Sequence, residues 1–177
     1  MAKRRLDQLD VAGKRVLVRV DFNVPIDQGI EGISLYDQRL RATLPTIQYL
    51  IDQGSKIVLC SHLGRPNGVV VEGLRLAPVG DRLATLLECP VKSLPEITGP
   101  VVADAVSAMV PGDIILLENL RFHPGEEEND RVFACELADT VDCFVMDAFA
   151  VAHRAHASTD GIIKFLPSAM GLLYREK

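Results

Sequence analysis

The chain has 177 residues, of which 48% are hydrophobic, so it fits one ordinary globular domain and is not an intrinsically disordered segment. Its formal net charge is -5, which argues against a nucleic-acid binder, because such proteins usually carry a basic surplus. This charge still allows a few arginines to converge on a small anion while the rest of the surface stays acidic.

No stretch of the sequence indicates secretion or a membrane anchor. The first five residues are basic, but no apolar h-region follows them, and no apolar run is long enough to span a bilayer. None of the cysteines forms a C-x-x-C pair, and we interpret them as reduced thiols of a cytoplasmic protein. They are Cys60, Cys89, Cys135 and Cys143.

The first third of the chain predicts a strand, a connection and a helix. Residues 15–20 are interpreted as a strand with alternating apolar residues that leads into a loop, residues 21–25, with Pro25 closing the strand. Residues 27–36 are interpreted as a turn-rich connection because they contain Gly29 and Gly32. Residues 37–53 predict an amphipathic helix of about four turns. Gly54 is its expected stop, and Pro45 should kink it.

Strands and helices continue to alternate after this helix. Strands are predicted over residues 56–60, 91–94, 113–117 and 143–146, and helices over residues 76–87, 101–110, about 130–139 and 168–175. This alternation implies right-handed crossovers between parallel strands. We therefore expect an α/β fold of Rossmann-like, three-layer αβα type, with a mainly parallel sheet of about six strands.

Polar side chains follow four of the predicted strands at the point where each strand ends. They are Asp21 and Asn23; His62 and Arg65; Arg121 and His123; and His153, Arg154 and His156. The carboxyl ends of parallel strands share one edge of the sheet, so these loops could form one crevice, which Arg39 could join. Guanidinium groups match phosphate and carboxylate oxygens. The pattern predicts a site for a small, multiply charged anion.

Each of these residues also has a structural interpretation. A single arginine can be a surface residue or a salt-bridge partner, and His123 and His156 can be structural. The pairs His153/His156 and Cys60/His62 suggest metal, but no set of three or four ligands has familiar zinc spacing. Residues 126–128, three consecutive glutamates, are interpreted as an exposed acidic run beside a helix start.

The sequence lacks three common motifs. It contains no G-x-G-x-x-G dinucleotide fingerprint, no G-x-x-x-x-G-K-[ST] phosphate loop and no G-x-S-x-G segment. Side chains, and not a glycine-rich cradle, are therefore expected to hold the anion. A Rossmann-type dinucleotide binder is a weaker alternative, since the glycine fingerprint is missing.

Four segments together resemble the signature segments of the phosphoglycerate kinase family. They are VRVDFNVP at 18–25, SHLGRP at 61–66, LENLRFHPGEE at 117–127 and AHRAHAS at 152–158, in the family's order. The resemblance covers nearly the whole chain but only the amino-terminal half of the family's protein. It implies that residues 1–177 are the substrate-binding domain, ending in the interdomain hinge helix, and that the carboxy-terminal nucleotide domain is absent from this chain.

The resemblance also implies the reaction and the partners. The family's enzyme, a phosphotransferase with a carboxyl group as acceptor, reversibly transfers a phosphoryl group between 1,3-bisphosphoglycerate and ADP, giving 3-phosphoglycerate and ATP in glycolysis. Mg-ADP and Mg-ATP would be bound by the absent domain, and no cofactor is expected to bind this chain tightly. The implied partners are 3-phosphoglycerate or 1,3-bisphosphoglycerate and the enzyme's own carboxy-terminal domain, with no nucleic acid and no membrane. A cytoplasmic monomer is expected, inactive as an isolated domain.

By matching position, the resemblance assigns roles to the strand-end residues. The hydroxyl and carboxyl end of the substrate would lie at Asp21, Phe22 and Asn23. The fixed 3-phosphate would be held by His62, Arg65, Arg121 and Arg154, with Leu63 and Gly64 in the same binding segment. Arg39 would face the transferred phosphoryl group as the catalytic residue.

Some positions depart from the family's pattern. Ala150 and Val151 replace the usual Gly-Thr, and Met146 stands where Asn is common. A Cβ at position 150 could restrict the backbone, and Val151 has no hydroxyl to donate. The stretch before Arg39, residues 33–38, is longer and more apolar than usual. These departures leave open a non-catalytic anion-sensing or scaffold module on the same fold.

Overall fold

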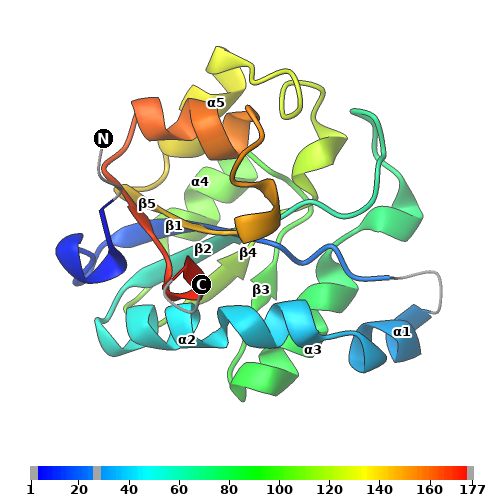
Figure 1. The fold of residues 1–177 in the computed structure, drawn as a ribbon, viewed down its shortest axis with the longest axis horizontal. Coiled ribbons are helices and arrows are strands. Elements are labelled where there is room, and N and C mark those ends of the chain that lie inside the picture. The colour runs from blue at the N-terminus through cyan, green and yellow to red at the C-terminus, as the bar shows by residue number, and fades with distance from the viewer. Residues whose placement is uncertain (1–3, 26–28, 175–177) are drawn as a thin grey trace.

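The computed structural model describes residues 4–25 and 29–174 (Figure 1). Its centre is a six-stranded sheet in the order β3-β4-β2-β1-β5-β6, in which every neighbouring pair is parallel. The strands are β1 (Arg15–Val20), β2 (Lys56–Cys60), β3 (Lys92–Ser93), β4 (Ile114–Leu116), β5 (Cys143–Asp147) and β6 (Ser168–Met170). The predicted α/β class and parallel sheet are confirmed.

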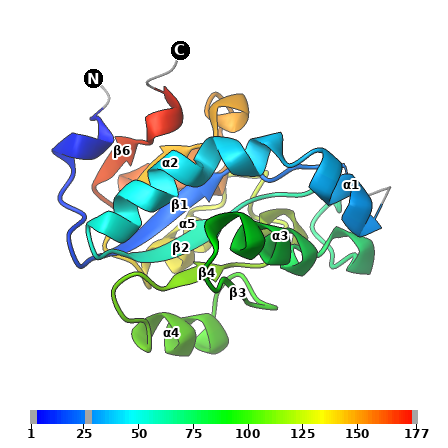
Figure 2. The same cartoon turned by 90° about the horizontal axis from the view of Figure 1, so that it is seen from below.

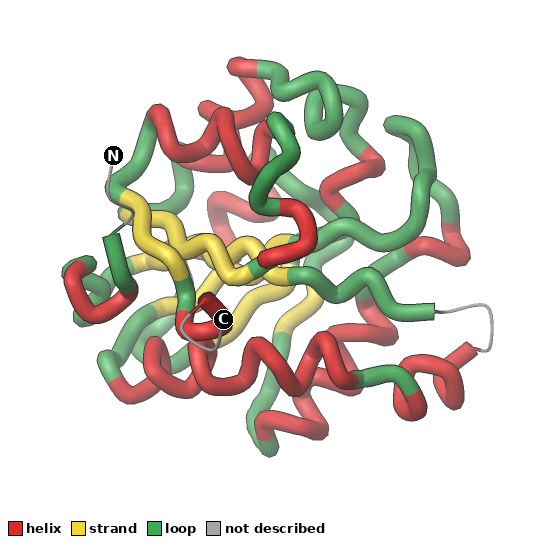
Figure 3. Tube along the Cα trace, in the orientation of Figure 1, coloured by secondary structure: helices red, strands yellow, loops and turns green. Residues whose placement is uncertain are grey.

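Helices cover both faces of the sheet, which gives three layers (Figure 3). The helices are α1 (Gly29–Leu35), α2 (Gln38–Asp52), α3 (Ala77–Leu87), α4 (Pro100–Ser107) and α5 (Arg131–Ala138). Successive residues of a strand point to opposite faces. Val16 and Val18 accordingly pack with residues of α2 and α3, whereas Leu17 packs with residues of α4 and α5. Figure 2 shows α2 and α3 together on the side of the sheet away from α4.

Helix α2 has the apolar face and the stop that its sequence predicts. Leu40 and Ile47 are fully buried on this face. Gly54 has φ +68°, its N–H donates to Ile51 O at 2.9 Å, and the Ser55 N–H donates to Leu50 O at 3.0 Å. This is the pair of bonds of a Schellman motif, for which glycine has the lowest steric cost. The helix continues through Pro45, and the kink expected there stays a prediction.

Two sequence predictions about secondary structure are wrong. Residues 29–35 form α1 instead of a turn-rich connection, because Ile33 is buried in the core and its packing outweighs the low helix propensity of the nearby glycines. The helix predicted over 168–175 is replaced by β6 and a 3₁₀ turn, Leu172–Tyr174, with residue 175 outside the described part. Ala169 aligns with Val145 of β5, and the Met170 N–H donates to Arg4 O at 2.9 Å, so sheet pairing decides this segment.

The described part of the chain agrees with the interpretation of the cysteines as free thiols. All four are unpaired. Burial is the main reason that the pKa of Cys60 is raised to about 12 and that of Cys143 to about 11. Neither thiol is therefore set up as a nucleophile. None of the helices described here combines the length and the apolar character needed to cross a membrane.

Candidate anion-binding site

The loops that follow β1 and β2 are joined directly. The two strands are parallel neighbours, so their carboxyl ends lie side by side. Asn23 Oδ1 accepts a hydrogen bond from the Gly64 N–H at 2.9 Å, and Ser61 Oγ accepts one from the Phe22 N–H at 2.9 Å. These two bonds fix the register of the two loops.

Asn119 attaches the loop after β4 to the same edge. Its Oδ1 accepts from the Leu63 N–H at 3.2 Å and from the Arg121 N–H at 3.1 Å, while its Nδ2 donates to Leu63 O at 2.8 Å. The carboxamide is fully buried and orients the 3₁₀ turn Leu120–Phe122. Arg121 is thereby turned toward the β2 loop, where its Nη1 donates to Gly64 O at 3.0 Å.

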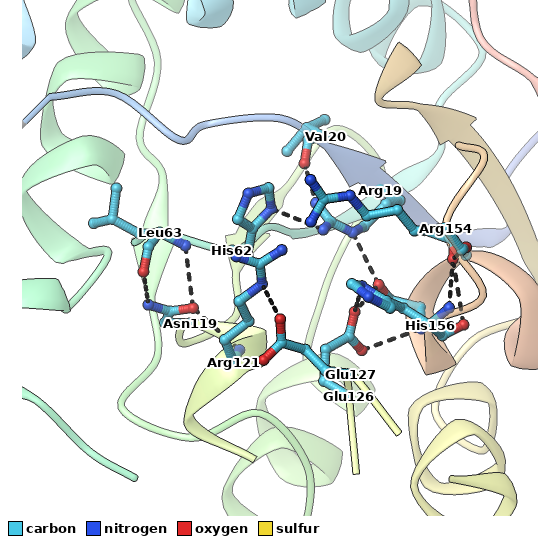
Figure 4. A network of polar contacts seen from close by, with 12 residues as sticks. Arg19, Val20, His62, Leu63, Asn119, Arg121, Glu126, Glu127, Arg154 and His156 are labelled. Carbon is cyan, nitrogen blue, oxygen red and sulfur yellow. Dashed lines mark hydrogen bonds and ion pairs between the residues drawn. The ribbon is translucent and has the colours of Figure 1, made fainter. Parts of the chain in front are cut away.

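Cations gather around a buried, neutral histidine. His62 is only 4% exposed, and its pKa is lowered to about 2, first by burial and then by the positive charges of four arginines. In order of effect, these are Arg19, Arg121, Arg154 and Arg39. Figure 4 shows Arg121 beside His62 and Arg19 bonded to its ring. Arg39, Arg121 and Arg154, three of the predicted site residues, are thus close enough to His62 for their charges to affect its pKa.

Arg121 carries an available donor in this cluster. It is 4% exposed, and burial is the main cause that lowers the pKa of its guanidinium. Its Nη1 is bonded to Gly64 O, and its Nε lies 3.5 Å from Glu127 Oε1. Its Nη2 is buried and has no hydrogen-bond partner among residues 4–25 and 29–174. A bound anion would satisfy this N–H group, which is otherwise costly to bury.

Arg39 is held by a carboxylate at the end of β1. Its Nη1 lies 2.7 Å from Asp21 Oδ2, and Asp21 Oδ1 accepts from the Asn23 N–H at 3.1 Å. Beside this pair lies a cavity of about 490 Å³. Its lining combines Asn23, Arg39 and Gly64 with the apolar residues Val24, Leu63 and Leu74, among others. Such a cavity suits a small ligand with charged ends and a short carbon backbone.

Of the remaining strand-end residues that the sequence singled out, some are buried or packed in the fold and others are exposed. The side chains of Phe22 and Leu63 are buried in the core, so their contribution to the site is through the backbone. Arg65 is exposed and is not among the cations that act on His62. His123 stacks on Phe133 with ring centroids 3.9 Å apart, which makes it a structural residue. His153 is exposed.

The interpretation of residues 126–128 as an exposed acidic run is wrong for Glu126. Glu127 and Glu128 are exposed, but Glu126 is fully buried. Its carboxylate accepts hydrogen bonds from the N–H and the hydroxyl of Ser158. Its neighbours come from the loop after β5, 32 positions away, which a local charge pattern does not reveal.

Arg19 is the second site residue that the sequence pattern missed. It lies within β1 and is fully buried. The available signal was a charged residue in a strand whose other positions are almost all apolar, because arginine is rarely buried unless it is paired. Arg19 brings a further guanidinium against His62.

The departures at positions 150 and 151 have different outcomes. Ala150 is exposed in a 3₁₀ turn, Phe149–Val151, and is not one of the residues with positive φ. Its backbone therefore has a conformation that alanine adopts without strain. Val151 is 3% exposed and belongs to the core, so it cannot supply a polar contact.

Metal ligation finds no support in the part of the chain that is described. There, no group of three or more His, Cys, Asp or Glu side chains is arranged to hold a metal ion. The donors at this sheet edge are guanidinium, imidazole, amide and backbone N–H groups, which are suited to oxygen anions.

Comparison with known proteins decides the family. The family profile described as phosphoglycerate kinase matches residues 6–177. The chain belongs to the phosphoglycerate kinase family. The structure of phosphoglycerate kinase from Pyrococcus horikoshii OT3 superposes with a TM-score of 0.88 at 33% identity, and that from Coxiella burnetii with 0.82 at 37% identity.

These phosphoglycerate kinases are longer than the present chain. Each match covers 98% of this chain, but only 43% of the Pyrococcus horikoshii protein and 42% of the Coxiella burnetii protein. The resemblance seen in the four sequence segments is thus confirmed, and the fold agrees with that of a phosphoglycerate kinase over nearly all of this chain.

Proposed function

We propose that these 177 residues are the substrate-binding half of a phosphoglycerate kinase, the glycolytic enzyme that interconverts 1,3-bisphosphoglycerate and ADP with 3-phosphoglycerate and ATP. The observation that carries this proposal is the group of arginines around the neutral His62, in which Arg121 Nη2 is a buried donor without a partner in the described residues. Buried donors of this kind favour a small, multiply charged anion.

The fixed 3-phosphate of the substrate would bind between Arg121 and His62. Arg121 cannot turn away easily, because its Nη1 is bonded to Gly64 O. Arg65 and Arg154 are exposed, and they would close on the phosphate from the solvent side. The other end of the substrate would enter the cavity of about 490 Å³, which Asn23 and Arg39 line and beside which Asp21 holds Arg39.

Arg39 would stabilise the phosphoryl group during transfer. Phosphoryl transfer requires mainly positioning and charge stabilisation, with little covalent chemistry from the protein. The Asp21 carboxylate holds the Arg39 guanidinium in a defined place at the cavity wall. We assign Mg-ADP and Mg-ATP, as co-substrates, to a carboxy-terminal domain of the enzyme. Closure of the two domains would exclude water, which otherwise hydrolyses an acyl phosphate.

The isolated polypeptide of 177 residues would therefore bind 3-phosphoglycerate without turnover. We further propose that the protein works as a monomer in the cytoplasm. Its partners would be the phosphoglycerate substrates and its own carboxy-terminal domain.

Calorimetric titration with 3-phosphoglycerate tests this proposal. The wild-type chain should bind, and Arg65→Ala should bind at least about tenfold more weakly, because a hydrogen bond to a charged group is worth about 1.5–3 kcal/mol. Arg15→Ala is the matched control. It removes the same charge at the amino end of β1, whereas the proposed site lies at the carboxyl ends of the strands. Absence of binding by a folded wild type, or equal binding by wild type and Arg65→Ala, would contradict the site assignment.

A non-catalytic anion sensor is the second candidate, and the burial of Val151 favours it. The family usually has threonine at this position, and a valine in the core supplies no hydroxyl. Joining this chain to the nucleotide-binding half of a close relative separates the candidates. A folded hybrid that binds 3-phosphoglycerate and turns over supports the kinase, and one that binds without turnover supports the sensor.

A further inference from the structure

Arg19 makes a set of directed hydrogen bonds below the anion site (Figure 4). Its Nη2 lies 2.9 Å from His62 Nδ1, its Nε donates to Ser158 Oγ at 2.9 Å, and its Nη1 donates to Val20 O. The side chain is fully buried in the sheet. Every nitrogen of the guanidinium is therefore engaged by a defined partner.

The contact between Arg19 and His62 determines which ring nitrogen carries the proton. A guanidinium has five N–H donors and no acceptor, and it does not lose its charge in proteins. His62 Nδ1 must then be the acceptor in the contact of 2.9 Å. A neutral ring that accepts at Nδ1 carries its proton at Nε2. Nε2 itself bonds to none of the residues that the structure describes.

The charge of Arg19 is balanced through a hydroxyl. Ser158 Oγ accepts from Arg19 Nε and donates to Glu126 Oε1, and the Ser158 N–H donates to Glu126 Oε2 at 3.1 Å. Glu126 is fully buried, so its negative charge is available to Arg19 through this short relay. Buried charges are costly unless they are compensated in this way. A chain of hydrogen bonds thus runs from Glu126 through Ser158 and Arg19 to His62, and in each bond the donor and the acceptor are fixed.

Among the described residues, the charges with the largest effect on the pKa of His62 are all cations. They are Arg19 in β1, Arg39 in α2, Arg121 in the 3₁₀ turn after β4 and Arg154 in the loop after β5. Their positive charge and the burial of the ring both oppose a second proton on the imidazole. His62 therefore stays neutral over the physiological pH range.

We propose that Arg19 is a positioning residue that, supported by Ser158 and Glu126, fixes His62 as the neutral Nε2–H tautomer and so presents one N–H donor to the bound phosphate. This inference rests on the proposed function for the identity of the ligand. His62 would then contribute a hydrogen bond without exchanging a proton, and the positive charge of the site would come from its arginines alone.

The tautomer can be measured on the ligand-free, ¹⁵N-labelled chain. Long-range ¹H–¹⁵N correlation spectra distinguish a protonated ring nitrogen from a bare one. The expected result is a bare Nδ1 and a protonated Nε2 for His62, unchanged between about pH 5.5 and 8, the range in which an ordinary histidine titrates. A proton on Nδ1, or a doubly protonated ring within this range, would overturn the proposal.

Variants test whether Arg19 is the cause. In Arg19→Met, both tautomers of His62 should appear, and the affinity for 3-phosphoglycerate should fall about tenfold, the equivalent of one good hydrogen bond. Arg15→Met, the control on the same strand, should change neither the tautomer nor the affinity. If Arg19→Met does not fold because Glu126 is left uncompensated, the double variant Arg19→Met/Glu126→Gln keeps the buried charges balanced. A folded variant without Arg19 that keeps a pure Nε2–H tautomer contradicts the proposal.

A substitution at His62 itself separates a neutral donor from a charged one. His62→Gln keeps a neutral N–H donor and should retain more affinity for 3-phosphoglycerate than His62→Ala. Equal losses in both variants would show that the N–H group does not contact the ligand. A chain that shows the Nε2–H tautomer but does not bind 3-phosphoglycerate contradicts the proposed function. A chain that binds it with the proton on Nδ1 contradicts the tautomer inference alone.

Discussion

Asn23 Oδ1 accepts a hydrogen bond of 2.9 Å from the Gly64 N–H, and this bond ties the loop after β1 to the loop after β2. The carbonyl of the same glycine accepts from Arg121 Nη1 at 3.0 Å. The backbone of Gly64 thus binds the side-chain amide of Asn23, from the loop after β1, and the guanidinium of Arg121, from the turn after β4. Its φ of +62° makes this geometry easy for glycine and strained for other residues.

Gly64→Ala should weaken both the fold and the site. A left-handed backbone costs an L-residue about 1–2 kcal/mol, and the added Cβ would lie 2.8 Å from Leu74 Cδ2. Leu74 lines the cavity beside Arg39, so its displacement should also lower the affinity for 3-phosphoglycerate. Urea unfolding and calorimetry measure the two effects.

Gly73→Ala is the control for this substitution. A Cβ at Gly73 meets no atom within 4 Å, and φ there is not positive. Its free energy of unfolding should stay within about 0.5 kcal/mol of wild type. If Gly64→Ala behaves in the same way, Gly64 does not hold the two loops together.

Arg121→Met should separate stability from binding. Burial disfavours the charged form of Arg121, so replacing it with an apolar side chain of similar length should leave the free energy of unfolding unchanged or raise it by about 1 kcal/mol. The affinity for 3-phosphoglycerate should fall at least about tenfold, because a charge-assisted hydrogen bond is lost. Thermal unfolding with and without ligand reports both quantities. A large loss of stability with unchanged affinity would make Arg121 a structural residue.

The sequence predicted the central strands because each is a short apolar run buried on both faces. It missed β6, whose three residues carry no usable pattern and pair only because β5 is beside them. At the site, Asn23 and His62 were predictable because they directly follow strands. Arg19 was not predictable in this way. Its partner Ser158 is 139 positions further along the chain, so the burial of this pair depends on tertiary contacts that a short stretch of sequence does not reveal.

Stability should fall as pH rises through the titration of Asp147. Burial raises the pKa of this carboxyl to about 6, above its ordinary value of 3.8. The folded state therefore favours the protonated form. The stabilisation is complete below about pH 4 and is lost as pH rises through about 6, a change of roughly 3 kcal/mol.

Asp147→Asn keeps an oxygen acceptor for the Leu173 N–H and removes the charge. Urea unfolding should find it more stable than wild type at about pH 7.5 and equal at about pH 4. Asp142→Asn should show the opposite sign, because Arg15 lowers the pKa of Asp142. A difference between Asp147→Asn and wild type that does not change with pH would refute this account.

Asp37 should stabilise the junction of α2 and α3. Its carboxylate is 7% exposed and lies 2.8 Å from Arg41 Nε and 2.6 Å from Arg82 Nη2. Asp37→Ala should lower the free energy of unfolding by about 2 kcal/mol. The hydrogen bond from Arg41 does most to lower the pKa of Asp37, so this stabilisation is present above about pH 4 and is lost on further acidification.

Asp52→Ala is the matched control on the same helix. Asp52 is exposed and accepts one hydrogen bond, from Gln48 Nε2. It should change the free energy of unfolding by no more than about 0.5 kcal/mol. Since Asp37 lies two positions before Arg39, Asp37→Ala should also weaken 3-phosphoglycerate binding, whereas Asp52→Ala should not.

The most direct test of the anion site is a crystal structure of this chain with 3-phosphoglycerate. The phosphate should lie at the carboxyl edge of the sheet, with oxygens within about 3 Å of Arg121 Nη2 and His62 Nε2. The carboxylate end should point into the cavity beside Arg39. A ligand bound at any other face, or a phosphate out of reach of both Arg121 and His62, would contradict the account.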